Sequence, residues 1–234
     1  MNSSSIGWIG VRRVPVGYPV IAFVNVFERS EQMTETQLLN RPDASSAKPL
    51  IVGIGGTTRE GSSTEKALAF ALQRAEALGA RTQLFGGPFL ARLPAFAPHD
   101  ASSTPEEREL LAAVREADGI IIASPGYHGS ISGVIKNALD CLNELGDDPA
   151  PFLQGKPAGL IITADGSQAA GSTLVALRSI IHALRAWPTP FGAALTASAN
   201  SFGAAGEPRD PKDAWQLETV ATQVMEFVRM RASV

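Results

Sequence analysis

The feature that most constrains the fold is an alternation of short apolar runs with longer segments of helical period. Five runs are candidate strands, and unbroken β-branched runs are typical of strands covered on both faces. They are residues 50–55, 81–85, 119–124, 158–163 and 191–196. Three intervening segments, 131–142, 174–184 and 217–228, repeat apolar residues at helical spacing. This alternation predicts βαβ units, and therefore an α/β domain with a doubly wound, five-stranded parallel sheet and helices on both faces.

The first 48 residues do not follow this pattern. Proline, serine and polar residues interrupt them, so we predict an irregular N-terminal arm at 1–48 before an α/β domain at 49–234. The apolar stretch at 20–27 is much shorter than the ~18 residues of a membrane span, and no signal-cleavage pattern follows it. We therefore expect no membrane association. Met33 is a candidate alternative start.

Composition excludes several classes of function. With 44% apolar and 18% charged residues, the chain can bury a sizeable core. A net charge of -3 argues against a nucleic-acid partner, which requires a basic surface. The single cysteine, Cys141, excludes an internal disulfide and fits a reducing, cytoplasmic location. The histidines have no ligand partners at suitable spacing, so no metal site is predicted.

The loop after the first candidate strand has the composition of an anion site. Gly55 and Gly56 allow a sharp turn, and the loop opens a helix whose free N–H groups favour negative charge. Arg59 adds a fixed positive charge. Hydroxyl donors are supplied by Thr57, Thr58, Ser62, Ser63 and Thr64. The loop is therefore predicted to bind a terminal phosphate.

Other phosphate-binding motifs do not match this loop. A Walker P-loop needs a Gly-Lys pair, and a Rossmann fingerprint needs a glycine where Thr58 stands. A metal-dependent receiver domain needs acidic residues beside the strand, and none is present. Ser62 and Glu65 also spell the capping sequence S-x-x-E. Ser62 is thus compatible with capping the helix, with binding the ligand, or with both.

The loop after the third candidate strand offers flat side chains and exposed backbone. It contains Pro125, Gly126, Tyr127, His128, Gly129 and Ser130. The proline and the first glycine are expected to end the strand, and Ser130 to begin the next helix. The two planar rings suit a flat heteroaromatic ligand at the edge where the strand order reverses. No acid or nucleophile stands beside His128, so we assign it no catalytic role.

These two loops resemble those of the NADPH-dependent FMN reductases, a family of flavodoxin-like fold. The family's first loop reads G-S-x-R-x-x-S-x-N/T, matched by Gly56, Thr57, Arg59, Ser62 and Thr64. Its second reads P-x-Y-x-x-S/G and then I-P/S-G-x-L/I-K-N-x-x-D, matched by Pro125, Tyr127, Ser130, Ile131, Gly133, Ile135, Lys136, Asn137 and Asp140. The resemblance covers residues 49–195 and includes neither the first 48 residues nor the last helix.

The resemblance implies which residues bind FMN. The phosphate would be held by Arg59 with Thr57, Ser62, Thr64 and the neighbouring Ser63. Residues 125–130 would line the isoalloxazine ring. The third loop, residues 164–171, would place Asp165, Gly166 and Ser167 beside the pyrimidine end of the flavin. Asp165 is expected to face solvent, because its carboxylate would repel an anionic reduced flavin.

The resemblance also implies an oxidoreductase. Hydride would pass from NADPH or NADH to flavin N5 and then to a second acceptor, such as free flavin, oxygen, a quinone or a flavin-dependent monooxygenase. No side chain is assigned an acid–base role. The alternative is a flavodoxin-type electron carrier without NAD(P)H turnover, against which the weak net charge argues. Family members usually form dimers or tetramers, so we expect a homodimer or homotetramer.

Overall fold

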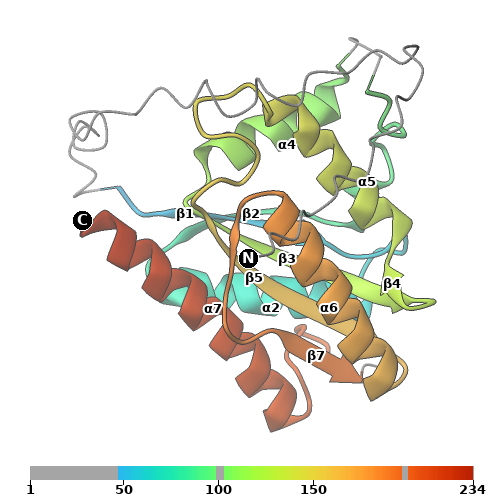
Figure 1. The fold of residues 1–234 in the computed structure, drawn as a ribbon. Coiled ribbons are helices and arrows are strands. Elements are labelled where there is room, and N and C mark those ends of the chain that lie inside the picture. The colour runs from blue at the N-terminus through green and yellow to red at the C-terminus, as the bar shows by residue number, and fades with distance from the viewer. Residues whose placement is uncertain (1–46, 99–102, 197–199, 234) are drawn as a thin grey trace, which may run out of the picture. The chain divides into compact units, whose positions relative to one another are not determined.

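The computed structural model describes residues 47–98, 103–196 and 200–233, and these form a parallel sheet with helices on both faces (Figure 1). The strands are β1 (Leu50–Gly55), β2 (Arg81–Phe85), β3 (Gly119–Tyr127), β4 (Ser130–Ile131), β5 (Pro157–Ala164), β6 (Trp187–Pro188) and β7 (Ala193–Thr196). The order across the sheet is β2-β1-β3-β5, with β6 and β7 both pairing with β5. The predicted doubly wound sheet is therefore confirmed, with its fifth position shared by two short strands.

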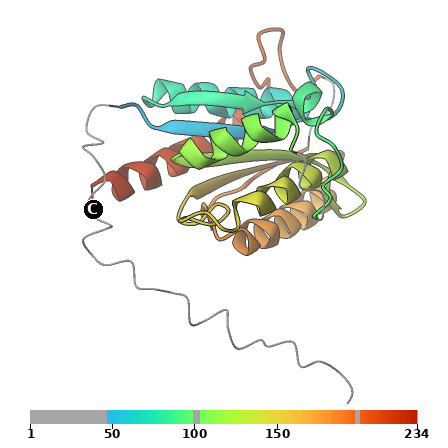
Figure 2. The same cartoon turned by 90° about the horizontal axis from the view of Figure 1, so that it is seen from above.

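The helices cover the sheet in two layers (Figure 2). They are α2 (Ser63–Ala77), α3 (Gly87–Leu90), α4 (Pro105–Glu116), α5 (Gly133–Cys141), α6 (Ser167–Ala183) and α7 (Pro211–Ala232), and a 3-10 turn, η1 (Leu142–Leu145), follows α5. Alternate residues of the strands face opposite layers. Ile121 packs with buried residues of α2 and α7, whereas Ile120 and Ile122 pack with those of α4, α5 and α6. Among the described helices, none combines the length and apolarity that crossing a bilayer requires.

Strand β3 is longer than predicted. Pro125 pairs with Thr163 of β5 and Gly126 pairs with Ile131 of β4, so the prediction that this Pro-Gly pair ends the strand is wrong. Strand β1 stops opposite Ala123. Beyond that point β3 is no longer paired with β1, and proline is tolerated where a ladder hydrogen bond is not required.

The segment after β3 is a tight hairpin. His128 and Gly129 have φ angles of 51° and 86°. Positive φ at both central residues is the signature of a two-residue type I′ turn, whose twist matches that of the flanking strands. Ser130 therefore lies in β4, and the prediction that it begins a helix is wrong. Helix α5 begins at Gly133.

The predicted bounds of the third loop also shift. The third loop is shorter than residues 164–171, because α6 already begins at Ser167 and only Asp165 and Gly166 separate it from β5. The predicted arm at 1–48 and the candidate start Met33 lie outside the described residues, apart from positions 47 and 48. The division into an arm and a domain stays a prediction.

The open edge of the sheet is covered by two glutamines of α7. The N–H group of Ala194 in β7 donates to Gln216 Oε1 at 3.2 Å, and that of Phe191 donates to Gln223 Oε1 at 2.9 Å. Both glutamines come from the same helix, one heptad apart. Unpaired N–H groups on an edge strand are a template for pairing with another chain. Gln216 accepts from one such group in β7, and Gln223 accepts from a second N–H group in the segment just before β7.

We predict that the double variant Gln216→Leu/Gln223→Leu loses stability and self-associates. Each substitution removes an acceptor from a backbone N–H, at about 1–3 kcal/mol per buried donor left unsatisfied. Urea unfolding would measure the loss, and analytical ultracentrifugation the association. Gln73→Leu, on the exposed surface of α2, serves as the control. Unchanged stability and mass in the double variant would contradict this role.

Candidate functional site

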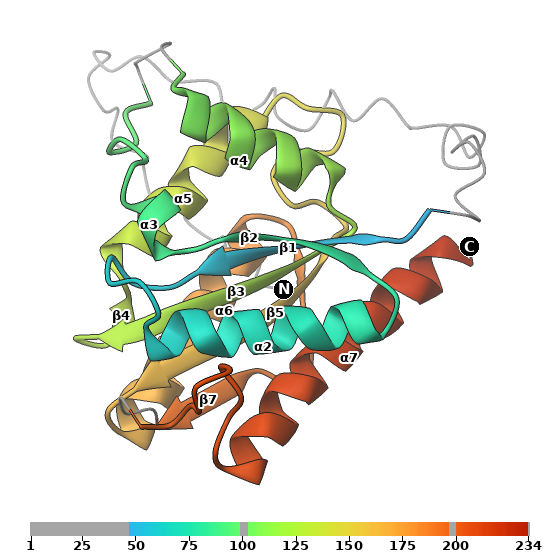
Figure 3. The same cartoon turned by 180° about the vertical axis from the view of Figure 1, so that it is seen from behind.

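The loops after β1, β3 and β5 meet at the carboxyl ends of the strands, next to the reversal of strand order between β1 and β3. Figure 3 shows the first loop and the β3–β4 hairpin at the same end of the sheet. The hydroxyl groups of Thr64 in α2 and Thr163 in β5 are hydrogen-bonded, with 2.6 Å between their oxygens. A Cβ on Gly126 of the hairpin would lie 2.8 Å from Thr173 Oγ1 of α6. The three predicted loops are thus neighbours in space.

The first loop leaves its cationic side chain free to bind an anion. Gly56 has a φ of 125°, a conformation that L side chains rarely adopt. Thr57 shares its hydroxyl with the backbone of Arg59, accepting from the Arg59 N–H at 3.2 Å and lying 3.2 Å from its carbonyl oxygen. The Arg59 side chain is exposed and makes no hydrogen bond or ion pair within the described part of the chain. A guanidinium in this state is available for a phosphate.

The three hydroxyls at the start of α2 differ in their surroundings. Ser62 is 2% exposed and is the N-cap, accepting from the Glu65 N–H at 3.3 Å, so the capping interpretation is confirmed. Its hydroxyl proton remains a donor. Thr64 is also 2% exposed and is bonded to Thr163, whereas Ser63 is half-buried. That these three hydroxyls bind a phosphate stays a prediction.

The hairpin presents its two rings outward. Tyr127 is 52% exposed, and His128 at the turn is exposed too. Gly129 and Ser130 are exposed as well, whereas Pro125 is buried. Planar side chains on a rigid turn offer a stacking surface and do not enclose a ligand.

Two buried hydroxyls that the sequence analysis missed hold the hairpin in place. Ser124 donates its hydroxyl to the Pro125 carbonyl at 2.9 Å and accepts from the Ser132 N–H at 3.0 Å. On the other side, Thr173 lies 3.5 Å from the Ser130 carbonyl oxygen. A lone serine in an apolar strand and a lone threonine in a helix form no motif. The signal that the sequence offers is a polar residue at a position where the apolar pattern of the strand or helix predicts a buried one.

The third loop is short and polar. Asp165 is exposed, in keeping with the carboxylate expected to face solvent. Gly166 is the N-cap of α6 and has no side chain to cap it. Ser167 is exposed at the first position of this 17-residue helix. The first N–H groups of α6 therefore supply further donors beside the hairpin.

Two cavities of the described structure lie away from these loops. One of about 440 Å³ lies between α4 and α5 and includes Cys141 in its lining, and one of about 330 Å³ lies between α5 and α6. Neither is lined by a predicted cofactor-binding residue. Within the described ranges, no three metal-ligating side chains cluster. The candidate site between the three loops exposes Arg59 and Tyr127 to solvent.

We predict opposite effects for two neighbouring serines. Ser124→Ala orphans the buried N–H of Ser132 and should cost about 1–3 kcal/mol of unfolding free energy. The Ser132 hydroxyl is itself buried with no hydrogen-bond partner among the described residues, so Ser132→Ala should be neutral or stabilising. Urea unfolding of both variants tests this pair. Equal losses of stability would show that Ser124 is not the anchor of the hairpin.

A further prediction concerns Cys141, which is 1% exposed. Burial, followed by the nearby carboxylates of Glu107 and Asp140, raises the pKa of its thiol to about 11. Because the thiolate is the reactive form, iodoacetamide should modify the native protein slowly at pH 8 and faster as the pH approaches 11. Unfolding in urea should restore the rate of a free thiol. Equal native and unfolded rates at pH 8 would contradict the prediction.

Known proteins resemble the region that contains these loops. The family described as NADPH-dependent FMN reductase matches residues 49–201. A curated relative, the FMN-dependent NADPH-azoreductase of Staphylococcus aureus (strain USA300), is 38% identical over 77 residues, which are 33% of this chain and 37% of that protein. The chain therefore spans little more than a third of the length of this relative.

Two solved structures share the fold. FerB, a flavoenzyme NAD(P)H:(acceptor) oxidoreductase from Paracoccus denitrificans, superposes with a TM-score of 0.65 at 20% identity, over 78% of this chain and 98% of that one. A flavodoxin from Streptococcus pneumonia TIGR4 gives a TM-score of 0.51 at 15% identity, over 75% of this chain and 97% of that one. At such identities only the fold is comparable, and the predicted flavodoxin-like arrangement is confirmed.

Proposed function

The chain belongs to the NADPH-dependent FMN reductase family, and from this premise we propose that it is an NAD(P)H-dependent FMN reductase. The resemblance predicted from its two loops is confirmed by the family match. The proposed reaction takes a hydride from NADPH or NADH through FMN to a second acceptor. For that acceptor we propose a small molecule such as free flavin, oxygen, a quinone or an azo compound.

The observation that carries this proposal is the loop after β1. Its backbone turns at Gly56, where a Cβ would lie 2.9 Å from the backbone nitrogen of Gly87, so the loop and its neighbour leave room only for a bare backbone. The Arg59 side chain has no hydrogen-bond or ion-pair partner among the described residues. The loop leads into the N-terminus of α2, where N–H groups and the helix dipole favour an anion. These donors fit the terminal phosphate of FMN, with Thr57 and Ser62 as hydroxyl donors.

The remaining loops fit the ring of the same ligand. FMN would supply the hydride chemistry at its N5 atom. Tyr127 and His128 would lie along the ring, and Pro125 would form the floor of the hairpin beneath it. The open N–H groups at the start of α6, after Asp165 and Gly166, would stabilise negative charge on the pyrimidine edge. No side chain of the chain needs to hold or move a proton in this scheme.

The exposure of the hairpin supports a second subunit over the flavin. Tyr127 is 52% exposed, and His128 at the turn is exposed too. A partner covering this surface would exclude water from the ring and shape access for the acceptor. We therefore retain a homodimer or homotetramer as part of the proposal.

An assay with free FMN, NADPH and NADH under air separates the reductase from a flavodoxin-type carrier. The reductase oxidises one or both pyridine nucleotides, whereas a carrier leaves both unoxidised. A visible spectrum of the purified chain before and after addition of FMN reports binding independently of turnover.

For the same site we predict that Arg59→Ala raises the Kd for FMN about tenfold, or about 1.4 kcal/mol. Riboflavin, which lacks the phosphate, should bind both proteins equally. Arg81→Ala removes the same charge from the opposite end of the sheet and should change neither affinity. Fluorescence titration measures both ligands. Failure of the wild-type chain to bind FMN, or an unchanged Kd in Arg59→Ala, would refute the proposed site.

A further inference from the structure

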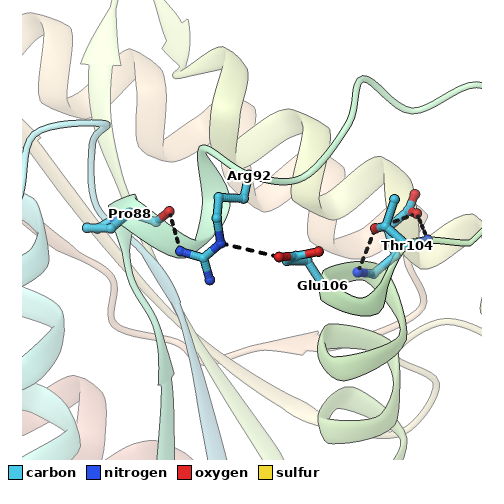
Figure 4. A network of polar contacts seen from close by, with 5 residues as sticks. Pro88, Arg92, Thr104 and Glu106 are labelled. Atoms are coloured by element: carbon cyan, nitrogen blue, oxygen red, sulfur yellow. Dashed lines mark hydrogen bonds and ion pairs between the residues drawn. The ribbon is translucent and has the colours of Figure 1, made fainter.

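Helices α2 and α4 begin with the same capping sequence, Ser/Thr-x-x-Glu, but the two sequences form different contacts. At the start of α4, Thr104 and Glu107 make a complete capping box (Figure 4). The Thr104 N–H donates to Glu107 Oε2 at 2.7 Å, and the Glu107 N–H donates to Thr104 Oγ1 at 3.2 Å. At the start of α2 only the first half forms, between the Glu65 N–H and Ser62 Oγ. The Glu65 carboxylate is used elsewhere.

Glu65 instead connects α2 to the segment that follows β2. Its Oε2 accepts a hydrogen bond from the Gly87 N–H at 2.9 Å, across 22 residues of sequence. The same oxygen would lie 3.1 Å from a Cβ on Gly56 and 3.0 Å from a Cβ on Gly86. The carboxylate therefore fills the space between the phosphate loop and the start of α3.

The contact between these two segments is made by bare backbone. A Cβ on Gly87 would lie 1.5 Å from the Thr57 carbonyl oxygen, so only glycine allows this approach. Gly87 thus packs directly against Gly56 and Thr57, and Glu65 accepts a hydrogen bond from its N–H group. The position of Thr57 and Arg59 depends on this packing.

We propose that Glu65 is a positioning residue for the FMN phosphate. By holding the Gly87 backbone against Gly56 and Thr57, it fixes the loop conformation that presents Thr57 and Arg59. This inference rests on the proposed function. Glu65 acts as a hydrogen-bond acceptor of the right length, since a second negative charge beside a phosphate dianion is unfavourable.

A set of substitutions distinguishes the positioning role of Glu65 from helix capping and from its negative charge. Glu65→Ala removes the acceptor, Glu65→Asp keeps the charge but shortens the reach, and Glu65→Gln keeps an acceptor oxygen at full length without the charge. Glu107→Ala breaks the complete capping box of α4 and is the matched control for a lost helix cap. FMN and riboflavin are titrated by flavin fluorescence, with each variant's stability measured by urea unfolding.

We expect Glu65→Ala and Glu65→Asp to raise the Kd for FMN about tenfold. Their Kd for riboflavin should stay unchanged. Glu65→Gln should bind FMN as tightly as the wild-type chain or more tightly. Glu107→Ala should lose stability, without a change in the ratio of the two affinities. If Glu65 had only a general structural role, its substitution would not change the ratio of the FMN and riboflavin affinities.

Three outcomes would overturn the inference. The first is an unchanged FMN-to-riboflavin affinity ratio in Glu65→Ala. The second is a loss in Glu65→Gln as large as that in Glu65→Asp, which would mean that an acceptor oxygen at full length does not preserve the binding of FMN. If Glu65→Ala fails to fold, the comparison of Glu65→Asp with Glu65→Gln decides. The third is no binding of FMN by the wild-type chain, which refutes the proposed function itself and is distinguished by the wild-type titration.

Discussion

The parallel pairing of β1 with β3 is the constraint on which the rest of the site depends. Its last matched pair is Gly55 and Ala123, after which β1 turns into the phosphate loop while β3 continues to Tyr127. The two loops therefore leave the sheet at different distances along the strand direction. This offset makes a step between the first loop and the hairpin, because the hairpin extends beyond the end of β1.

Most of the buried polar side chains among the described residues lie near this step, with Thr189 and Gln216 as the exceptions. Elsewhere the sheet is built from fully buried isoleucines, but at the carboxyl ends Ser124, Thr163, Thr64 and Thr173 are all within 5% of complete burial. Each of them is hydrogen-bonded across elements or close to a backbone carbonyl. Buried hydroxyls are costly when unpaired and rigidifying when paired. The loops that they tie down are thus prepared before a ligand arrives, which is what accurate binding requires.

The sequence predicted the regular part of this structure well, including the bounds of β1 and β2 as observed. In β1 an unbroken apolar run leaves few alternatives. It failed where a residue's meaning depends on its neighbours in space. Pro125 indicated a strand end, but the missing β1 neighbour makes proline acceptable there. Ser62–Glu65 and Thr104–Glu107 are equivalent as sequence, and only the approach of Gly87 distinguishes them. The first loop could be proposed as a phosphate site because its residues are contiguous in sequence, whereas its contact with a segment more than 20 residues away could not be foreseen.

The charges around the phosphate loop show why that support matters. Arg59 and Lys66 are balanced by Glu60 and Glu65, so the segment has no net formal charge. A dianion cannot be attracted here by an excess of cations, as it would be on a basic surface. Its binding must come from directed donors, namely backbone N–H groups, hydroxyls and one guanidinium. Directed donors work only over a narrow range of distance and angle. The backbone that carries them must therefore be fixed, and a glycine-on-carbonyl contact such as that of Gly87 with Thr57 fixes it more closely than side-chain packing could.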